Sequence, residues 1–148
     1  MRRTDAARAA AALACALLCV PAARADGPAL SLRVTQGLWA GALRDGTVLA
    51  QVRLGYPESH CGLLVWSEAP VVNGQPGRYA LAGKNAPGQT LRVRLTGRDW
   101  RPDTTGGKGM VLDGGEASAT LEVVADGDQA VRAEIWPLSL QAAATGCR

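Results

Sequence analysis

The single histidine of the chain, His60, stands next to Cys61, and this pair could in principle support nucleophilic or metal chemistry. Neighbouring side chains of a strand point to opposite faces, so these two are poorly placed to touch each other. A zinc site needs three or four ligands, and after the N-terminal segment only Cys147 could add one. We therefore interpret His60 as a structural or surface residue and expect no metal.

The glycine-rich stretch at residues 97–109 offers two further candidates for chemistry. Asp99 and Asp103 lie four residues apart in a segment where aspartates usually cap turns, so we do not assign them acid–base roles. The motif Thr105-Gly106-Gly107-Lys108-Gly109 resembles a phosphate-binding loop only superficially. The Walker pattern requires glycine where Pro102 stands, and serine or threonine where Gly109 stands. We expect no cofactor, and we predict that the protein is not an enzyme.

Cationic side chains gather around one tryptophan, and we take this group as a candidate surface for contact with a partner. Its members are Arg92, Arg94, Arg98, Trp100 and Arg101. Two simpler interpretations remain open. The arginines could form a solvated strand face, and Trp100 could fold over the edge of a β-sandwich instead of contacting a partner.

The first 25 residues have the pattern of a cleaved secretory signal. Three arginines precede an unbroken run of 12 apolar residues, and Ala23-Arg24-Ala25 is the small-x-small motif that signal peptidase reads. The run is shorter than the roughly 20 apolar residues that span a bilayer. An uncleaved anchor, or a lipoprotein modified at Cys15 or Cys19, is the alternative. We expect residues 26–148 to form a single domain.

The predicted signal also accounts for the formal net charge of +3. It carries four of the 16 basic residues and one of the 13 acidic residues, so 12 of each remain. A neutral mature chain gives no reason to expect nucleic acid or an anionic membrane as a partner. Of four cysteines, Cys61 and Cys147 remain, in a compartment where disulfides form. We expect these two to pair, which would contribute about 4–5 kcal/mol in the chain-entropy model.

The mature chain has the pattern of short strands separated by turns. Residues 29–35 and 90–96 alternate apolar and polar side chains with the period of a half-buried strand. Residues 38–43 are expected to continue the first strand. Further strands are predicted at 47–54, 61–67, 78–82 and 118–125.

The last predicted strand covers residues 131–141. Its alternation changes phase near Pro137, which predicts a bulge or an edge position. Residues 97–109 are expected to form a loop. No mature segment carries a helical stripe, and 18 glycines and eight prolines with closely spaced turns favour an all-β, immunoglobulin-like sandwich.

A series of motifs stands in consistent order along residues 30–147. They are Leu43-Arg44-Asp45-Gly46, Glu58 and His60 before Val65-Trp66, Asn73-Gly74, Arg78-Tyr79, Leu91-Arg92-Val93-Arg94, Asp99 with Trp100, Gly106-Gly107-Lys108-Gly109, and Ala125-Asp126-Gly127. This series resembles the AfaD/AggB invasin family of Gram-negative bacteria. In one departure, the family's first cysteine falls near Tyr56, five residues before Cys61, so a bond from Cys61 is expected to begin inside its strand.

The resemblance implies a subunit of a surface adhesin that is assembled by the chaperone–usher route. Such subunits are pilin-type sandwiches that lack their final strand. A periplasmic chaperone fills the gap first, and a donor strand from a neighbouring pilin subunit then replaces it, next to an outer-membrane usher. This assembly is β-augmentation, in which main-chain hydrogen bonds pair an open edge and alternate apolar side chains fill pockets. The resemblance also implies export through the periplasm to the cell surface, in a fimbrium or afimbrial sheath, and attachment to a host cell-surface receptor.

The position of the first strand suggests where the subunit would lie. Alternation begins at about Leu30, a few residues after the predicted cleavage site, and leaves no room for a donor segment. We therefore expect a tip subunit that accepts a strand and donates none. The alternative is a free-standing secreted or periplasmic sandwich that binds a ligand or inhibits a hydrolase. An exported hydrolase is disfavoured by the single histidine and the lack of paired carboxylates.

Overall fold

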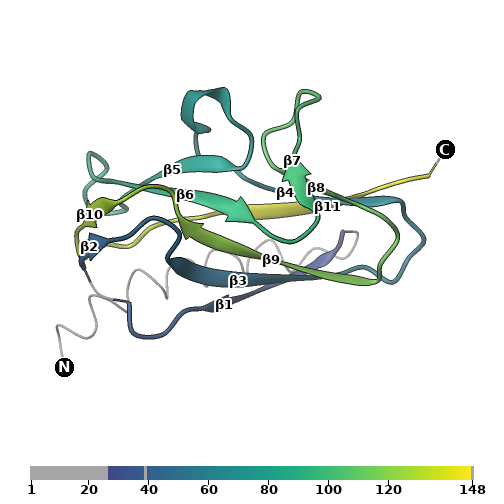
Figure 1. Ribbon diagram of the computed structural model, residues 1–148, viewed down its shortest axis with the longest axis horizontal. Coiled ribbons are helices and arrows are strands. Elements are labelled where there is room, and N and C mark those ends of the chain that lie inside the picture. Colours follow the sequence, from purple (N-terminus) through teal and green to yellow (C-terminus); the bar gives the residue numbers. More distant parts are fainter. Residues whose placement is uncertain (1–26, 39, 148) are drawn as a thin grey trace.

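The computed structural model describes residues 27–38 and 40–147, and the elements in them are almost all β-strands (Figure 1). The predicted signal peptide lies outside the described residues. The longer strands are β1 (Ala29–Val34), β3 (Val48–Gly55), β4 (Gly62–Ser67), β5 (Arg78–Ala82), β6 (Thr90–Thr96), β9 (Ser118–Ala125) and β11 (Leu140–Thr145). The shorter elements are β2 (Gly41–Leu43), β7 (Trp100–Pro102), β8 (Met110–Asp113), β10 (Gln129–Val131) and the 3₁₀ turn η2 (Val72–Gly74). The predicted all-β class is confirmed.

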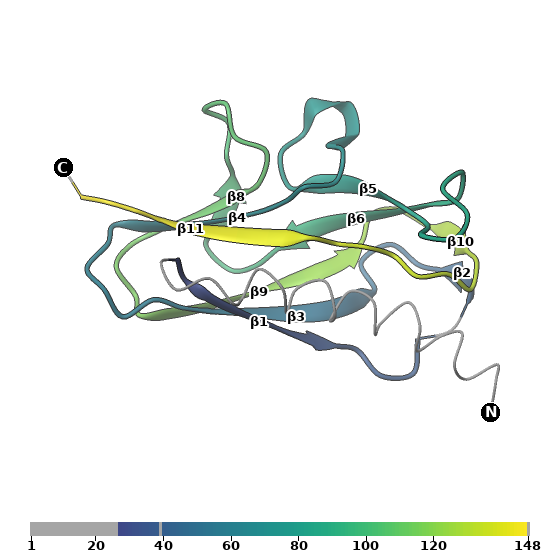
Figure 2. The ribbon, with the colours of Figure 1, turned by 180° about the vertical axis from the view of Figure 1, so that it is seen from behind.

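Two antiparallel sheets pack face to face. One has five strands in the order β1-β3-β9-β6-β5, and the other has four in the order β11-β4-β8-β7. Strands β2 and β10 pair separately and lie together at one end of the molecule (Figures 1 and 2). The arrangement is a β-sandwich, as the spacing of strands and turns predicted.

Alternation along the strands places one apolar set between the sheets. In β6, Leu91, Val93 and Leu95 are buried, whereas Arg92 and Arg94 face outward. The other long strands also alternate side chains that face the core with side chains that face outward. The buried cluster also includes Leu30, Ala50, Val52, Leu54, Leu63, Val65, Tyr79, Leu81, Leu121, Val123, Trp136, Leu138 and Leu140. Removing these side chains from water is the main force that holds the two sheets together.

Asp45 joins two turns at one end of the five-stranded sheet. Its Oδ1 lies 2.7 Å from Arg94 Nη1 and accepts a 2.7 Å hydrogen bond from the Gly127 N–H. The Asp45 N–H donates to Asp128 Oδ1 at 2.8 Å. The hydrogen bond from Arg94, followed by that from Gly127, holds the pKa of Asp45 below its ordinary value. Arg94 also pairs with Asp126.

The predicted strand at residues 131–141 is wrong. The structure has β10 ending at Val131, then a segment from 132 to 139 that belongs to no strand, and then β11 from Leu140 to Thr145. Pro137 has no N–H to give to a ladder, and Ser139 has a φ of 50°, so regular pairing begins only after it. Alternate residues from 134 to 140 are buried without interruption, so the expected change of phase at Pro137 is also absent.

Two other predictions about strands need correction. Residues 38–43 do not continue β1, because the chain turns at 36–37 and β2 pairs with β10 instead. The predicted loop at 97–109 contains β7, which pairs with β8 through Arg101 and Val111. Both strands are too short to show a clear alternation in the sequence.

Within residues 27–38 and 40–147, no helix is long and apolar enough to cross a membrane.

Candidate functional site

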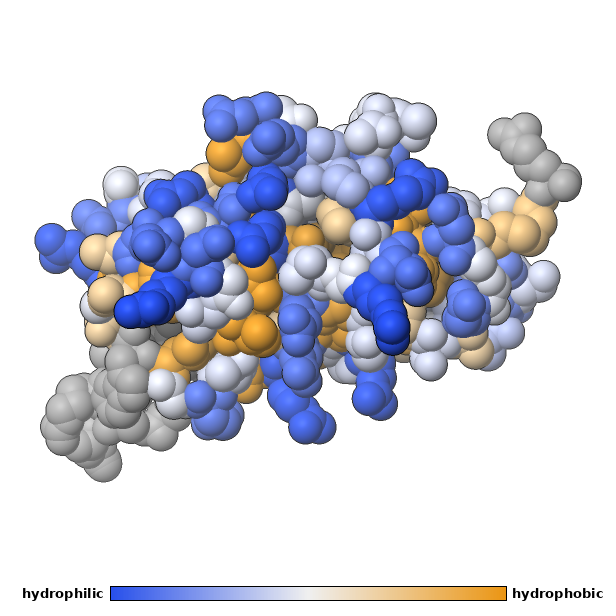
Figure 3. All heavy atoms as spheres, viewed as in Figure 1, coloured by the Kyte–Doolittle hydropathy of each residue, from blue (hydrophilic) through white to orange (hydrophobic). Residues whose placement is uncertain are grey.

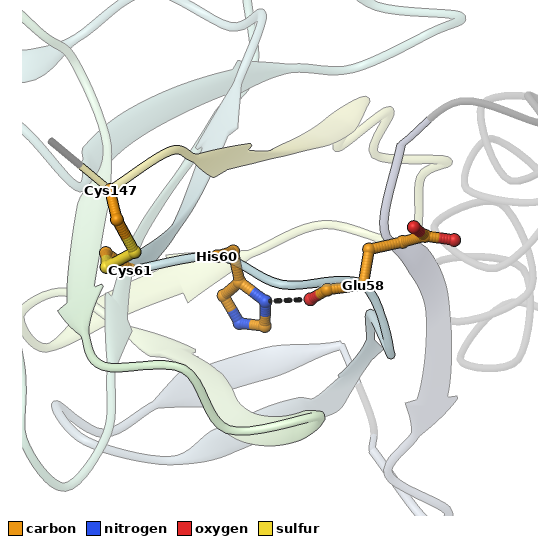
Figure 4. Close-up of a disulfide and its surroundings, with 4 residues drawn as sticks. All are labelled: Glu58, His60, Cys61 and Cys147. Carbon is orange, nitrogen blue, oxygen red and sulfur yellow. Dashed lines mark hydrogen bonds between the residues drawn. A yellow bond between two sulfur atoms is a disulfide. The ribbon is translucent and has the colours of Figure 1, made fainter.

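The predicted disulfide is present between Cys61 and Cys147. It joins the residue before β4 to a residue two positions after β11, and the two Cα atoms are 5.0 Å apart (Figure 4). The neighbouring pair Gly62 and Thr145 stands in register in the β4–β11 ladder, which brings the cysteines together. The expectation that the bond begins inside the strand is wrong, because β4 starts one residue after Cys61.

His60 is a structural residue in this fold. Its side chain is 6% exposed, and its Nδ1 lies 2.7 Å from the Glu58 carbonyl oxygen (Figure 4). The ring also packs edge to face against Tyr56, with 5.2 Å between the ring centres. Over the described part of the chain, no three His, Cys, Asp or Glu side chains gather where they could hold a metal.

Asp103 has the turn-capping role that its sequence context predicted. The side chain is buried, and its Oδ1 accepts hydrogen bonds from the Thr105 N–H at 3.2 Å and the Thr105 hydroxyl at 2.9 Å. A Cβ on Gly107 would collide with Asp103. The glycines of this motif therefore let the loop close over its own aspartate. Asp99, with a φ of 69°, occupies the left-handed conformation of the preceding turn.

Trp100 does not provide the exposed contact that was predicted for it. Its side chain is 8% exposed, and its Nε1–H donates to the Thr120 carbonyl oxygen at 2.9 Å. Gly97 makes this position possible, because a Cβ there would lie 2.7 Å from the indole. The alternative in which Trp100 folds over the edge of the sandwich is the one that the structure has.

The four arginines around Trp100 are divided between the two sheets. Arg92 and Arg94 lie on β6, whereas Arg101 lies on β7 and pairs with Asp113 at 3.2 Å. Arg98 is exposed in the turn between these strands. The structure therefore does not assemble the predicted receptor-contact residues into one face, and their role stays a prediction.

The sandwich has an open strand edge at β11. Among the described residues, β11 pairs only with β4, and β1 pairs only with β3. The Glu68 N–H donates to the Ser139 carbonyl at 3.1 Å, which fixes the odd-numbered residues as the ones bonded to β4. The main-chain N–H and C=O groups of Leu140, Ala142 and Ala144 therefore point away from β4.

The same three residues direct their side chains into the core. Leu140 is fully buried, and Ala142 and Ala144 pack against the buried cluster. The start of β1 lies close to this edge, since a Cβ on Gly27 would be 3.7 Å from the Ala142 carbonyl oxygen. The open edge of β11 thus combines outward main-chain groups with an apolar interior, which is what an added strand requires.

Sequence reasoning missed the extent of this edge. The signal was present as the alternation of Leu138, Leu140, Ala142 and Ala144, which continues past the point where the predicted strand ended. The small size of the last two side chains hid it. Alanine has a low strand propensity, so a run of alanines does not suggest a core strand.

An all-β sandwich with an open edge at β11 and a disulfide beside that edge is the class of protein that these features define. Comparison with known proteins specifies it further. A family model described as Enterobacteria AfaD invasin protein matches residues 39–142, more than half of the chain. The chain belongs to the AfaD invasin family, which confirms the resemblance seen in the sequence.

Individual relatives agree with this assignment. Protein AfaD of Escherichia coli is 39% identical over 88 residues, which cover 59% of each chain. Protein AggB of Escherichia coli is 32% identical over 88 residues, covering 59% of this chain and 60% of the relative. The chain thus matches about three fifths of the length of these curated relatives. The crystal structure of the Salmonella SafD adhesin superposes with a TM-score of 0.78 at 37% identity, covering 82% of this chain and 86% of that one.

Proposed function

We propose that this chain is a non-enzymatic subunit of a surface adhesin that is assembled by the chaperone–usher route. The observation that carries the proposal is the open edge of β11, where outward main-chain groups flank an apolar interior. Membership of the AfaD invasin family and similarity to the SafD adhesin support it. The chain would be exported through the periplasm, held there by a chaperone, passed to an usher and completed by a strand from a neighbouring subunit.

The proposal includes a position at the tip of the surface structure and attachment to a receptor on host cells. We expect the completed subunit to bind cultured epithelial cells, and immunogold labelling to mark the ends of the assembled structures. Labelling along the whole length of the structures would contradict the tip position, and no cell binding by the completed subunit would contradict the adhesive role.

Strand acceptance can be tested with a synthetic peptide that alternates valine or isoleucine with threonine or lysine. The control peptide has the same composition with the alternation broken. We expect only the alternating peptide to raise the thermal midpoint of the purified exported chain. It should also slow hydrogen exchange at the Ala144 N–H, which points away from β4. Equal effects of the two peptides would contradict the proposal.

A proline substitution makes the test specific for the edge. Ala142→Pro removes an outward N–H that the β4 ladder does not use, so we expect it to abolish stabilisation by the peptide. Ala82→Pro is the matched control, because Ala82 lies at the far edge of the other sheet and its N–H also points outward. If Ala142→Pro lowers the thermal midpoint of the chain without peptide, this variant cannot be compared directly. The hydrogen-exchange measurement at Ala144 in the unaltered chain then decides whether the peptide binds at the edge of β11.

A further inference from the structure

A concave surface, separate from the open edge of β11, lies on the outer face of the five-stranded sheet. It encloses about 870 Å³ and is lined by outward side chains of β1, β3 and β9 and by the turn at 97–100. The strand register orders these side chains in two rows. Ser31, Arg53 and Thr120 form one row, and Arg33, Gln51 and Glu122 form the other. We call this surface the arginine groove.

The cations of the arginine groove differ from three other arginines of the two sheets. Arg33 and Arg53 are diagonal neighbours on adjacent strands, and Arg98 stands on the wall beside them. Within the part of the chain that the structure describes, none of the three forms an ion pair. Arg78, Arg94 and Arg101, by contrast, all pair with aspartates. The groove therefore presents guanidinium groups whose donors are not used by the carboxylates of the described residues.

Acidic and neutral polar groups make up most of the remaining lining, with apolar residues such as Leu32, Trp100 and Leu112 between them. Glu122 is half-buried on the floor, and Asp99 and Glu116 stand on the wall. Three carboxylates beside three guanidiniums give a surface that both accepts and donates hydrogen bonds, with little net charge. Figure 3 shows blue polar side chains on this side of the molecule, with orange apolar areas between them.

The geometry restricts what could occupy the groove. Strands β3 and β9 are paired on both sides, so the part of the face that they form offers no main-chain groups to an added peptide strand. A polar lining gives an apolar ligand little to gain. A volume within the usual range of ligand sites, with guanidiniums for anions and Gln51, Thr120 and Glu122 for hydroxyl groups, fits a hydroxylated, anionic ligand.

We propose that the arginine groove binds an acidic oligosaccharide on the host cell surface. Arg33 and Arg53 would hold the carboxylate or sulfate groups through paired N–H donors, and the remaining polar side chains would bind sugar hydroxyls. The inference deepens the attachment part of the proposed function and rests on it. It does not depend on the edge of β11, which belongs to the other sheet.

Three sugars separate the possible sources of the acidic group. Sialyllactose carries a carboxylate, a heparin tetrasaccharide carries sulfates and carboxylates, and lactose carries neither. We expect the exported chain, completed with the alternating peptide, to bind at least one acidic sugar at least tenfold more tightly than lactose in titration calorimetry. Binding should weaken as salt is raised, because the contacts are between charges. Equal binding of lactose, or no binding of either acidic sugar, would overturn the proposal.

Charge-neutralising variants locate the site. Arg33→Gln/Arg53→Gln is expected to weaken binding of the acidic sugar at least tenfold, whereas Arg132→Gln, at an exposed position outside the groove, should leave it unchanged. The side chains of Arg33 and Arg53 are exposed and lie outside the core, so the double variant should fold, and circular dichroism checks this. An equal loss in Arg132→Gln would overturn the location.

Two controls separate this inference from its alternatives. Binding of a poly-glutamate peptide, with the same dependence on Arg33 and Arg53 and no sugar binding, would overturn the proposal in favour of an acidic protein partner. Stabilisation by the alternating peptide without sugar binding would mean that this inference fails while strand acceptance stands. Sugar binding without stabilisation by the alternating peptide would mean that the groove binds sugar while strand acceptance at β11 fails.

Discussion

Tyr79 is the buried side chain that ties the β4–β5 region to the loop after β7. It is fully buried, and its hydroxyl donates to the Lys108 carbonyl oxygen at 2.6 Å. Tyr79→Phe keeps the ring and removes this hydrogen bond, so we expect the free energy of unfolding to fall by about 1 kcal/mol. Urea unfolding measures it. Tyr56→Phe is the control, because Tyr56 packs through its ring against His60. An equal loss in both variants would contradict the role of the hydrogen bond.

The same residue predicts a response to alkaline pH. Burial raises the pKa of Tyr79 to about 12, compared with about 10 in an unfolded chain. The unfolded chain therefore loses this proton first, and the stability contributed by the neutral phenol is lost as pH rises from about 10 to about 12. We expect the stability difference between the native chain and Tyr79→Phe to shrink over that range. A difference that stays constant with pH would contradict burial of the phenol.

At the scale of elements, Asp45 predicts how the two turns respond to acid. Its pKa is lowered by the hydrogen bond from Arg94, so the folded chain keeps the carboxylate ionised at a pH where the unfolded chain binds a proton. The contribution is present above the ordinary aspartate pKa, roughly 4, and is lost as pH falls below it. We expect Asp45→Asn to be less stable than the native chain at neutral pH, with the difference disappearing in acid. A difference between the two chains that stays constant from neutral pH into acid would contradict this role of the Asp45 carboxylate.

The strands that could be predicted are those whose side chains alternate over five or more residues. Residues 78–82 and 90–96 were predicted with the bounds of β5 and β6, and 118–125 with those of β9. Strands β2, β7, β8 and β10 have three or four residues each, too few for a period to show. Their pairing is decided by neighbours far along the chain, such as Ala42 opposite Ala130, which no local pattern reports.

The candidate sites were less predictable than the strands, for a related reason. The disulfide could be expected because two cysteines remained after the predicted signal. The open edge of β11 could not be placed, because Pro137 and Ser139 shift the start of that strand beyond the predicted one. The arginine groove combines Arg33, Arg53 and Arg98 from three separate segments, and only the sheet order brings them together. The sequence drew attention instead to arginines that are neighbours along the chain.

At the scale of the whole molecule, the disulfide is placed to hold the open edge in position. Strand β11 has one partner among the described residues, and the segment before it, from 132 to 139, belongs to no strand. The bond from Cys147 to Cys61 fixes the far end of β11 to the start of β4. An edge strand with a single partner would otherwise separate more readily than the central strands.

This placement predicts a local and a global effect of removing the bond. The cysteines are 86 residues apart, so Cys61→Ser/Cys147→Ser should lower the free energy of unfolding by about 4–5 kcal/mol in the chain-entropy model, measured by urea unfolding. Hydrogen exchange should also rise more at β11 than at β3, which has partners on both sides. If the bond acted only by restricting the unfolded chain, the amides of β11 and β3 that exchange through global unfolding would accelerate equally. A larger change at β11 would mean that the bond also keeps the acceptor edge ordered before a donor strand arrives, whereas equal changes would contradict that role.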